Sequence, residues 1–154
     1  MKKLFITAAI ATMFSITAFA ANGKHNKTED KVTYAALDQF AADFKSADNV
    51  VWTVTPNCQK VTFINNNNNY TAFYTFDGDY LGLTQDIAYK RIPTSVRSEI
   101  ANDYKGFEVA DVIKYKTTEA DEPVAYFVDI KKTGSEILLK VSADKSVSFF
   151  KEIE

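Results

Sequence analysis

The sequence is poor in the residues from which catalytic and metal sites are most often built. Its 154 residues include one cysteine, Cys58, and one histidine, His25. A single cysteine excludes a disulfide within the chain, so we expect a buried or incidental thiol and a fold held by core burial. His25 lies in the polar stretch ANGKHNKTED, where no apolar packing can hold it against a nucleophile. The sequence therefore argues against triad hydrolases and against catalytic zinc, which needs several His or Cys ligands.

The first 20 residues have the pattern of a secretory signal peptide. A basic MKK precedes an uncharged apolar run over residues 4–19, and AFA at 18–20 fits the cleavage rule. Cleavage would follow Ala20, so that the mature chain begins at Ala21. An N-terminal membrane anchor is the alternative, but the run of about 16 residues is shorter than the roughly 20 that a spanning helix needs. We therefore expect a periplasmic or secreted protein with no membrane span after cleavage.

The mature chain is mildly acidic. Loss of Lys2 and Lys3 leaves 16 of the 18 basic residues against 20 acidic ones, which moves the net charge from −2 to −4. This balance argues against nucleic acid or anionic lipid as a partner. Residues 21–30 contain no large apolar side chain and are predicted to be a flexible leader. Residues 31–154 suit a single domain with a sizeable core.

Two helices are predicted, over residues 31–47 and 93–107. The first carries an apolar stripe at helical spacing, made of Leu37, Phe40, Ala41 and Phe44. In the second, Pro93 suits the first turn and Gly106 suits the left-handed position after the last.

Eight runs rich in Val, Thr and aromatic residues, each bounded by turn residues, predict strands. They cover residues 49–55, 60–64, 70–76, 80–85, 108–116, 124–131, 135–142 and 146–153. The short connections imply antiparallel hairpins. Helices packed on one face of an antiparallel sheet make an α+β fold.

The order of one helix and four strands occurs twice in the predicted elements. Residues 40–52 (FAADFKSADNVVW) also match residues 100–112 (IANDYKGFEVADV) at several positions with a constant offset of 60. Together these features predict an internal duplication, with tandem half-repeats over about 31–90 and 91–154.

The stretch FDGDYLG at residues 76–82 suggests either a metal-binding loop or the turn of a hairpin. Counted from Asp77 as a calcium loop, Asp79 and Gly82 fall at fitting positions, but Leu81 and Ala88 occupy positions that need oxygen ligands. Asp-Gly between two alternating strand runs is among the strongest hairpin signals. We therefore predict a hairpin and no metal site, and SADKS at 142–146 is the equivalent turn in the second half.

Two further polar features have two interpretations each. The run NNNNN at 65–69 is predicted to be a solvated hairpin loop that tolerates positive φ, the alternative being a loop that recognises a ligand such as a sugar. A pair of carboxylates could in principle do acid–base work. We interpret them as solubility charges on turns and wet strand faces: Asp111, Glu119, Asp121, Glu122 and Asp129.

Aromatic side chains in or beside the predicted strands are the candidates for a binding surface. An antiparallel sheet with helices on one face leaves the other face open, and surplus tyrosine on an open face suits protein or glycan contact. Each ring could instead belong to the core. The candidates are Trp52, Tyr70, Tyr74, Tyr80 and Tyr126, and we choose Tyr74 as the solvent-facing ring to test.

The sequence resembles the PepSY-like, β-lactamase-inhibitor-like family of exported bacterial proteins. The resemblance rests on NVVWTV after a Phe-bearing helix, on TAFYTFDGDYLGLTQ, on DYKGFEVADVIKY, and on VAYFVDI, ILLKVS and VSFFK, and it covers residues 31–154. It implies an α+β domain of two repeated halves, with no catalytic residue and no cofactor. It also implies contact with a protein through the open sheet face and the hairpin loops.

Two functions remain open at this stage. The first is a non-catalytic exported module that binds or inhibits another periplasmic or extracellular protein, or binds a glycan, through an open sheet face. The second is a small-molecule-binding domain or small enzyme with a pocket between helices and sheet. A buried carboxylate in a closed pocket would favour the second.

Overall fold

The computed structural model describes residues 31–118 and 123–153. The predicted signal peptide, its cleavage site between Ala20 and Ala21, the leader and His25 lie outside these residues. The helices are α2 (Tyr34–Asp43), the 3-10 helix η2 (Tyr89–Arg91) and α3 (Thr94–Asp103). The strands are β1 (Asp48–Val54), β2 (Gln59–Asn65), β3 (Asn68–Tyr74), β4 (Tyr80–Asp86), β5 (Glu108–Thr117), β6 (Val124–Lys132), β7 (Ser135–Val141) and β8 (Val147–Ile153).

The strands follow one another in chain order, from β1 to β8, in an antiparallel sheet. This confirms the predicted α+β class and the predicted order of two helices and eight strands. The 3-10 helix was not predicted. The described residues form two compact units, which meet inside β4: unit 1 ends at Gly82 and unit 2 begins at Leu83. A common origin of the two halves stays a prediction.

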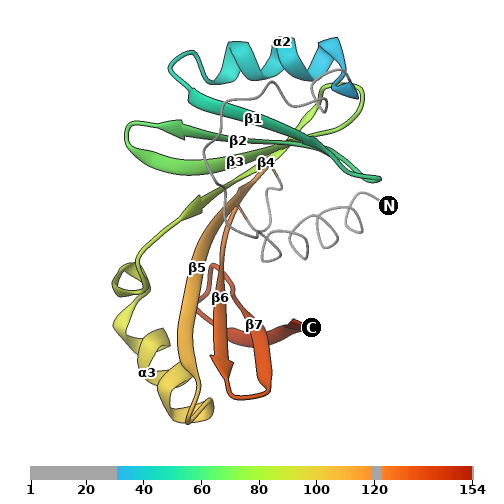
Figure 1. Ribbon diagram of the computed structural model, residues 1–154. Coiled ribbons are helices and arrows are strands. Elements are labelled where there is room, and N and C mark those ends of the chain that lie inside the picture. Colours follow the sequence, from blue (N-terminus) through green and yellow to red (C-terminus); the bar gives the residue numbers. More distant parts are fainter. Residues whose placement is uncertain (1–30, 119–122, 154) are drawn as a thin grey trace. The chain divides into compact units, whose positions relative to one another are not determined.

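In unit 1, α2 packs on one face of β1–β3 through aromatic rings (Figure 1). The Phe40 ring lies 5.5 Å from Trp52 and 5.1 Å from Phe63, both edge-on. Phe44, which follows the last residue of α2, lies 4.7 Å from Phe63. Ala41, predicted to lie on the apolar stripe, is exposed. Edge-to-face rings of this kind contribute beyond the area that they bury, so this cluster is the main attachment of the helix.

A buried amide joins the start of α2 to the strands. Gln59 on β2 is fully buried. Its Oε1 accepts from the Thr33 N–H at 2.7 Å, and its Nε2 donates to Thr33 Oγ1 and to the Thr75 carbonyl at 3.0 and 2.9 Å. Thr33 also caps the helix by accepting from the Ala36 N–H. Because each polar atom has a partner, this buried amide avoids the cost of unmade hydrogen bonds.

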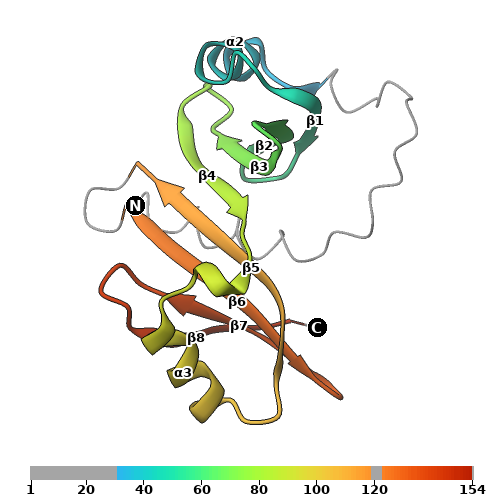
Figure 2. The ribbon, with the colours of Figure 1, turned by 90° about the vertical axis from the view of Figure 1, so that its left-hand side faces the viewer.

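In unit 2, α3 covers one side of strands β5–β8 (Figure 2). Val96 and Ile100 of the helix are buried against Val112, Val128 and Leu139 of the strands. Tyr104, which follows the last residue of α3, packs on the edge of this cluster, so it lies on the same side of the helix as Val96 and Ile100. Gly106 has φ +83, the left-handed conformation predicted for it after the helix.

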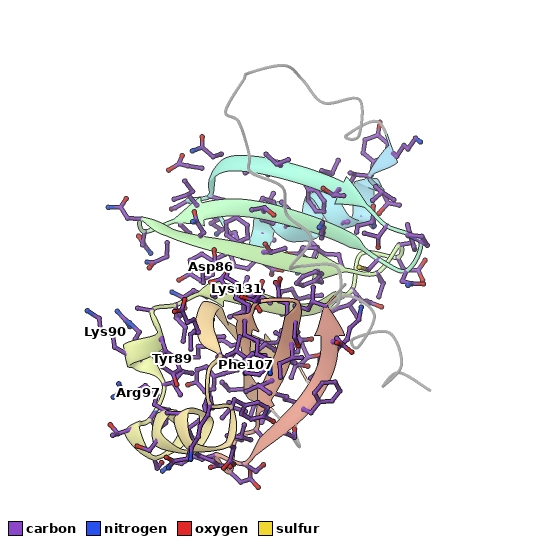
Figure 3. All side chains as sticks on the ribbon, turned by 60° about the horizontal axis from the view of Figure 1, so that its bottom comes forward. Asp86, Tyr89, Lys90, Arg97, Phe107 and Lys131 are labelled. Atoms are coloured by element: carbon purple, nitrogen blue, oxygen red, sulfur yellow. The ribbon has the colours of Figure 1, made fainter. Side chains whose placement is uncertain are left out.

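The segment before α3 is fixed by hydrogen bonds to the helix. The Tyr89 hydroxyl donates to the Arg97 carbonyl at 3.4 Å, and Arg97 Nε donates to the Ile92 carbonyl at 3.1 Å. Figure 3 labels Tyr89 and Arg97 in unit 2. Pro93 precedes the first helical turn with φ −52 and ψ 142, and does not lie within the turn as predicted.

Candidate functional site

Each helix covers one face of its own strands, and we call the opposite face of each unit its outer face. In unit 1 the outer face is made of short and aliphatic side chains with one lysine and one buried phenylalanine. Thr62 on β2 and Thr71 on β3 pair across it with their hydroxyl oxygens 3.2 Å apart. The members are Val51, Thr53, Lys60, Thr62, Ile64, Thr71 and Phe73, of which only Phe73 is buried, at 2% exposed.

The five predicted surface aromatics lie on the faces that the helices cover. Trp52 is 3% exposed and lies 5.9 Å from Tyr74 in the unit 1 core. Tyr70 stacks on Phe63 at 5.8 Å, and Tyr80 meets Tyr74 edge-on at 5.7 Å, so these half-buried rings border the same cluster. In unit 2, half-buried Tyr126 packs against the α3 cluster. Because Trp52 and Tyr74 are buried, they belong to the core and not to a binding surface. A binding role for the half-buried rings stays a prediction.

Tyr74 is the clearest correction, because the prediction that this ring faces solvent is wrong. It is 0% exposed, and its hydroxyl donates to Asp43 Oδ2 at 3.2 Å. Burial, followed by the charge of Asp43, holds the pKa of Tyr74 far above its usual value. A charged phenolate beside a carboxylate would repel it, so this hydroxyl is a structural donor to the end of α2.

The outer face of unit 2 differs from that of unit 1 because its centre is apolar and buried. Phe127 on β6 is 2% exposed and lies 5.0 Å from Phe150 and 6.5 Å from Tyr115. Ile113 and Leu138 on the flanking strands are also buried. Strand β6 is therefore buried on both faces in the middle of its length. The prediction of one wet, open sheet face describes the outer face of unit 1 better than that of unit 2.

A buried carboxyl pair borders this apolar centre. Asp129 on β6 is 4% exposed, and one of its oxygens hydrogen-bonds the carboxyl group of Glu136 on β7. The other, Oδ1, is buried and has no hydrogen-bond partner in the described part of the chain. Burial and then the Glu136 charge raise the pKa of Asp129 to about 6. The interpretation of Asp129 as a wet solubility charge is therefore wrong, because its strand position faces the apolar layer.

Exposed Asp111 on β5 lies directly opposite Asp129 and fits the predicted solvent charge better. Glu119, Asp121 and Glu122 lie outside the described residues. A third carboxylate therefore lies beside the carboxyl pair, on the neighbouring strand of the same face.

The FDGDYLG stretch forms the predicted hairpin turn. The Thr75 N–H donates to the Asp79 carbonyl at 2.9 Å, the Gly78 N–H donates to the Thr75 carbonyl at 3.1 Å, and Gly78 has φ +91. Asp77 and Asp79 are exposed. Across residues 31–118 and 123–153, no group of three or more His, Cys, Asp or Glu side chains is arranged to hold a metal ion.

The Asn run and the cysteine are also parts of turns. Asn66 and Asn67 have φ +49 and +60, as in a type I′ hairpin, and Asn65 pairs with Asn68. This confirms the prediction of a hairpin loop with positive φ. Cys58 is buried, as expected, and its N–H donates to Thr55 Oγ1 at 3.1 Å in the turn between β1 and β2.

Comparison with known proteins shows likeness in fold. No family model matches the chain. No curated protein matches it either. The fold is similar to a BLIP-like protein from Bacteroides fragilis, with a TM-score of 0.67 and 13% identity over 79% of this chain and 86% of that one. It is also similar to a periplasmic protein from Bacteroides eggerthii (TM-score 0.71, 12% identity, 79% and 89% covered) and to a DUF2874 family protein from Bacteroides uniformis (0.67, 13%, 75% and 85%).

At these identities the likeness shows the fold alone. The β-lactamase-inhibitor-like part of the resemblance is supported at the level of fold, whereas membership of the PepSY family stays a prediction. Among the helices that the structure describes, none is long and apolar enough to cross a membrane. From its elements and its likeness to these structures, the chain has a BLIP-like α+β fold.

Proposed function

We propose that this chain is an exported, non-catalytic module that binds another protein, and that unit 1 makes the contact through its outer face. The observation that carries the proposal is the half-exposed face of β1–β3 opposite α2, where Thr62 and Thr71 lie beside aliphatic neighbours. A mixed surface of hydroxyl and aliphatic groups resembles ordinary protein interfaces, which are about as apolar as the rest of a protein surface. The BLIP-like fold agrees with a binding role, and the relative from Bacteroides eggerthii agrees with a periplasmic location.

The proposed contact is a mixed surface of hydroxyl and aliphatic groups, and the aromatic anchors predicted in unit 1 lie on its opposite face. Trp52 and Tyr74 are buried under α2. Lys60, directly opposite Thr53 on the neighbouring strand, supplies a cation on β2, the central strand of the face. We therefore expect the contacting surface of the partner protein to be acidic or rich in hydroxyl groups.

The small-molecule alternative is favoured by one observation, the buried carboxyl group of Asp129 in unit 2. A buried, proton-binding carboxyl beside an apolar layer is a feature of functional sites as well as of structural ion pairs. This observation lies in a different unit from the proposed docking face and is developed separately below.

The experiment that tests the docking proposal is capture of a partner by immobilised protein, with paired variants. Replacing Thr62 and Thr71 together by Arg places two long charged side chains on the outer face and should abolish capture. The matched control replaces Ala41 and Ala42, exposed on α2 of the same unit, by Arg and should capture normally. Equal capture by both double variants would refute the outer face as the contact.

Export is tested separately, by sequencing the N-terminus of protein recovered from the periplasm or medium. We expect the first residue to be Ala21, because AFA at 18–20 fits signal-peptide cleavage. A protein that still begins at Met1 and sediments with membranes would refute the cleavage.

A further inference from the structure

The strands of unit 2 bring three carboxyl groups together on its outer face. Asp111 on β5 lies directly opposite Asp129 on β6, and Glu136 on β7 hydrogen-bonds Asp129 from the other side. The backbone register places Asp111 directly opposite Asp129, whereas Glu136 lies diagonally across from Asp129, opposite Lys131. Asp86 at the end of β4 acts electrostatically on Asp111 and adds a fourth negative charge at this end of the strands.

The buried oxygen of Asp129 distinguishes this cluster from an ordinary acidic surface. Asp129 is 4% exposed, and its Oδ1 lacks a hydrogen-bond partner in the described residues. A buried carboxylate oxygen without a partner is costly, and buried polar atoms in native proteins nearly always have one. Asp129 Oδ1 is therefore a buried hydrogen-bond acceptor to which no described group donates.

The donor that fits is an organic cation. The described carboxylates do not form a metal-binding group, whereas a guanidinium or ammonium group donates several N–H bonds and carries the charge that the cluster lacks. Lys131, opposite Glu136, is exposed and borders the cluster without a bond to the Asp129 Oδ1. Glu136 is half-buried and hydrogen-bonds Asp129, so its side chain is the group that would move when a cation binds.

We propose that Asp129 and Glu136, with Asp111 beside them, form a binding site for a guanidinium or primary ammonium group. The site is independent of the docking face on unit 1. In the empty protein below about pH 6 the two carboxyl groups share a proton, which bridges them by a hydrogen bond. When a cation binds the protonated pair, the shared proton leaves to solvent, and at higher pH no proton is released. In both cases the N–H groups of the cation donate to Asp129 Oδ1 and to Glu136.

The proton makes binding depend on pH. Below about pH 6 Asp129 holds the proton, so the cation must displace it and binding weakens. Above that pH the pair is negative and open to a cation. The charged groups on the strands packed around the pair are Asp86, Glu108, Asp111, Lys131, Lys140 and Lys151.

The test is calorimetric titration of the purified exported protein with agmatine, which carries both cationic groups, and with the tripeptide Gly-Arg-Gly. At pH 7.5 we expect saturable binding of at least one probe, with amide NMR shifts on β6 and β7. Binding should weaken at pH 5. Asp129→Asn, which keeps the shape of the side chain, should weaken it by about 10- to 100-fold, as expected for a lost charge-assisted bond. Glu136→Gln should also weaken it, and the matched control Asp103→Asn, which removes an exposed charge on α3, should not.

The two probes separate the sources of the cation. Binding of the tripeptide supports a side chain of a protein, and binding of agmatine alone supports a free amine. The proposal is overturned if neither probe binds, if Asp129→Asn leaves binding unchanged, or if calcium chloride alone binds at Asp129. Since no partner protein is used, these results do not depend on the docking face of unit 1.

Discussion

A single methyl group at Gly78 should destabilise the protein more than the same group at any other hairpin glycine. Gly78 has φ +91 in the turn between β3 and β4, and its backbone lies against the first turn of α2. A Cβ built at this position would be 2.8 Å from both the carbonyl carbon and the Cβ of Ala35, and 2.9 Å from its oxygen. Two of these atoms belong to the helix backbone, so a rotamer change cannot relieve the contact.

The expected loss of stability in Gly78→Ala has two parts, backbone strain and steric overlap, and a second glycine allows the first part to be measured alone. A Cβ at positive φ costs about 1–2 kcal/mol, and the stiffer unfolded chain offsets about 0.4–1 kcal/mol of that. Gly134, in the turn between β6 and β7, has φ +78 and no atom within 4 Å of a Cβ, so Gly134→Ala measures this first part alone. At Gly78 the overlap with Ala35 adds about 1–3 kcal/mol, as overpacking does elsewhere. We therefore expect a loss of roughly 2–4 kcal/mol for Gly78→Ala and about 1 kcal/mol or less for Gly134→Ala.

The second half of the chain supplies a natural reference for this turn. Ser142 and Ser146 bond across it as Thr75 and Asp79 do, and the residue in the place of Gly78 is Lys145, with φ +72. The same turn therefore accepts a side chain where this position is exposed, as Lys145 is. Lys145→Gly should change stability by only a few tenths of a kcal/mol, because relief of the positive φ and the entropy of glycine oppose each other.

Urea denaturation followed by the fluorescence of Trp52 is the assay, because this indole lies in the unit 1 core beside Phe40. Circular dichroism follows the same transition over the whole chain. Equal losses for Gly78→Ala and Gly134→Ala would refute the argument from close packing. Full rescue of Gly78→Ala by Ala35→Gly would assign the overlap to the Ala35 Cβ alone and would contradict a contribution from the two helix backbone atoms, which that change leaves in place.

Three further predictions concern buried polar groups. Tyr74→Ala should lower the free energy of unfolding, measured by urea denaturation, by about 3–5 kcal/mol, and Tyr74→Phe should lower it by about 0.5–1.5 kcal/mol. Because the pKa of Tyr74 is raised in the folded state, the stability of the wild-type protein should fall as the pH rises above 10, and that of Tyr74→Phe should fall less. Gln59→Leu should cost about 2–3 kcal/mol, since it leaves the Thr33 N–H and the Thr75 carbonyl without their bonds; a neutral result would contradict the role of the amide. The folded pKa of Asp129 is about 6, above its unfolded value, so stability should rise as the pH falls from 6 to 4 by on the order of 1 kcal/mol, after allowance for screening by solvent; in Asp129→Asn this rise should disappear, and an unchanged pH profile would show that another group causes it.

The elements were predictable from sequence because their signals are local. The two Asn residues with positive φ at 66 and 67 and the glycine at 106 lie where turn chemistry placed them. Alternation along β1 and β3 also put Trp52 and Tyr74 each on one definite face of its strand. Which of the two faces the helix covers depends on contacts between residues far apart in the chain, such as Phe40 with Trp52, and a period of two contains no such information. The aromatic surface was therefore assigned to the wrong side at these positions.

The carboxyl pair was missed for a related reason. In the strand VAYFVDIK, Asp129 shares a face with Phe127, and this alternation could have raised the question of a buried charge. Its partner Glu136 follows seven residues later, across a hairpin whose register decides whether the two groups meet. A one-residue slip would turn Glu136 to the other face of β7 and leave Asp129 beside a different side chain.

Each half of the chain thus has one α-helix followed by four strands. The two units differ in one hairpin turn and in their outer faces. The turn of unit 1 needs glycine because α2 lies against it, whereas the turn of unit 2 has lysine at the same φ. The outer face of unit 1 is half-exposed and rich in threonine, whereas that of unit 2 has a buried apolar centre bordered by carboxyl groups. If the halves arose by duplication, the faces covered by the helices had to stay apolar in both halves, whereas the outer faces were free to change in composition. A protein surface on one unit and a cation site on the other are then separable functions, and variants at Thr62 and at Asp129 should affect binding independently. Loss of both activities in either single-site variant would refute this separation.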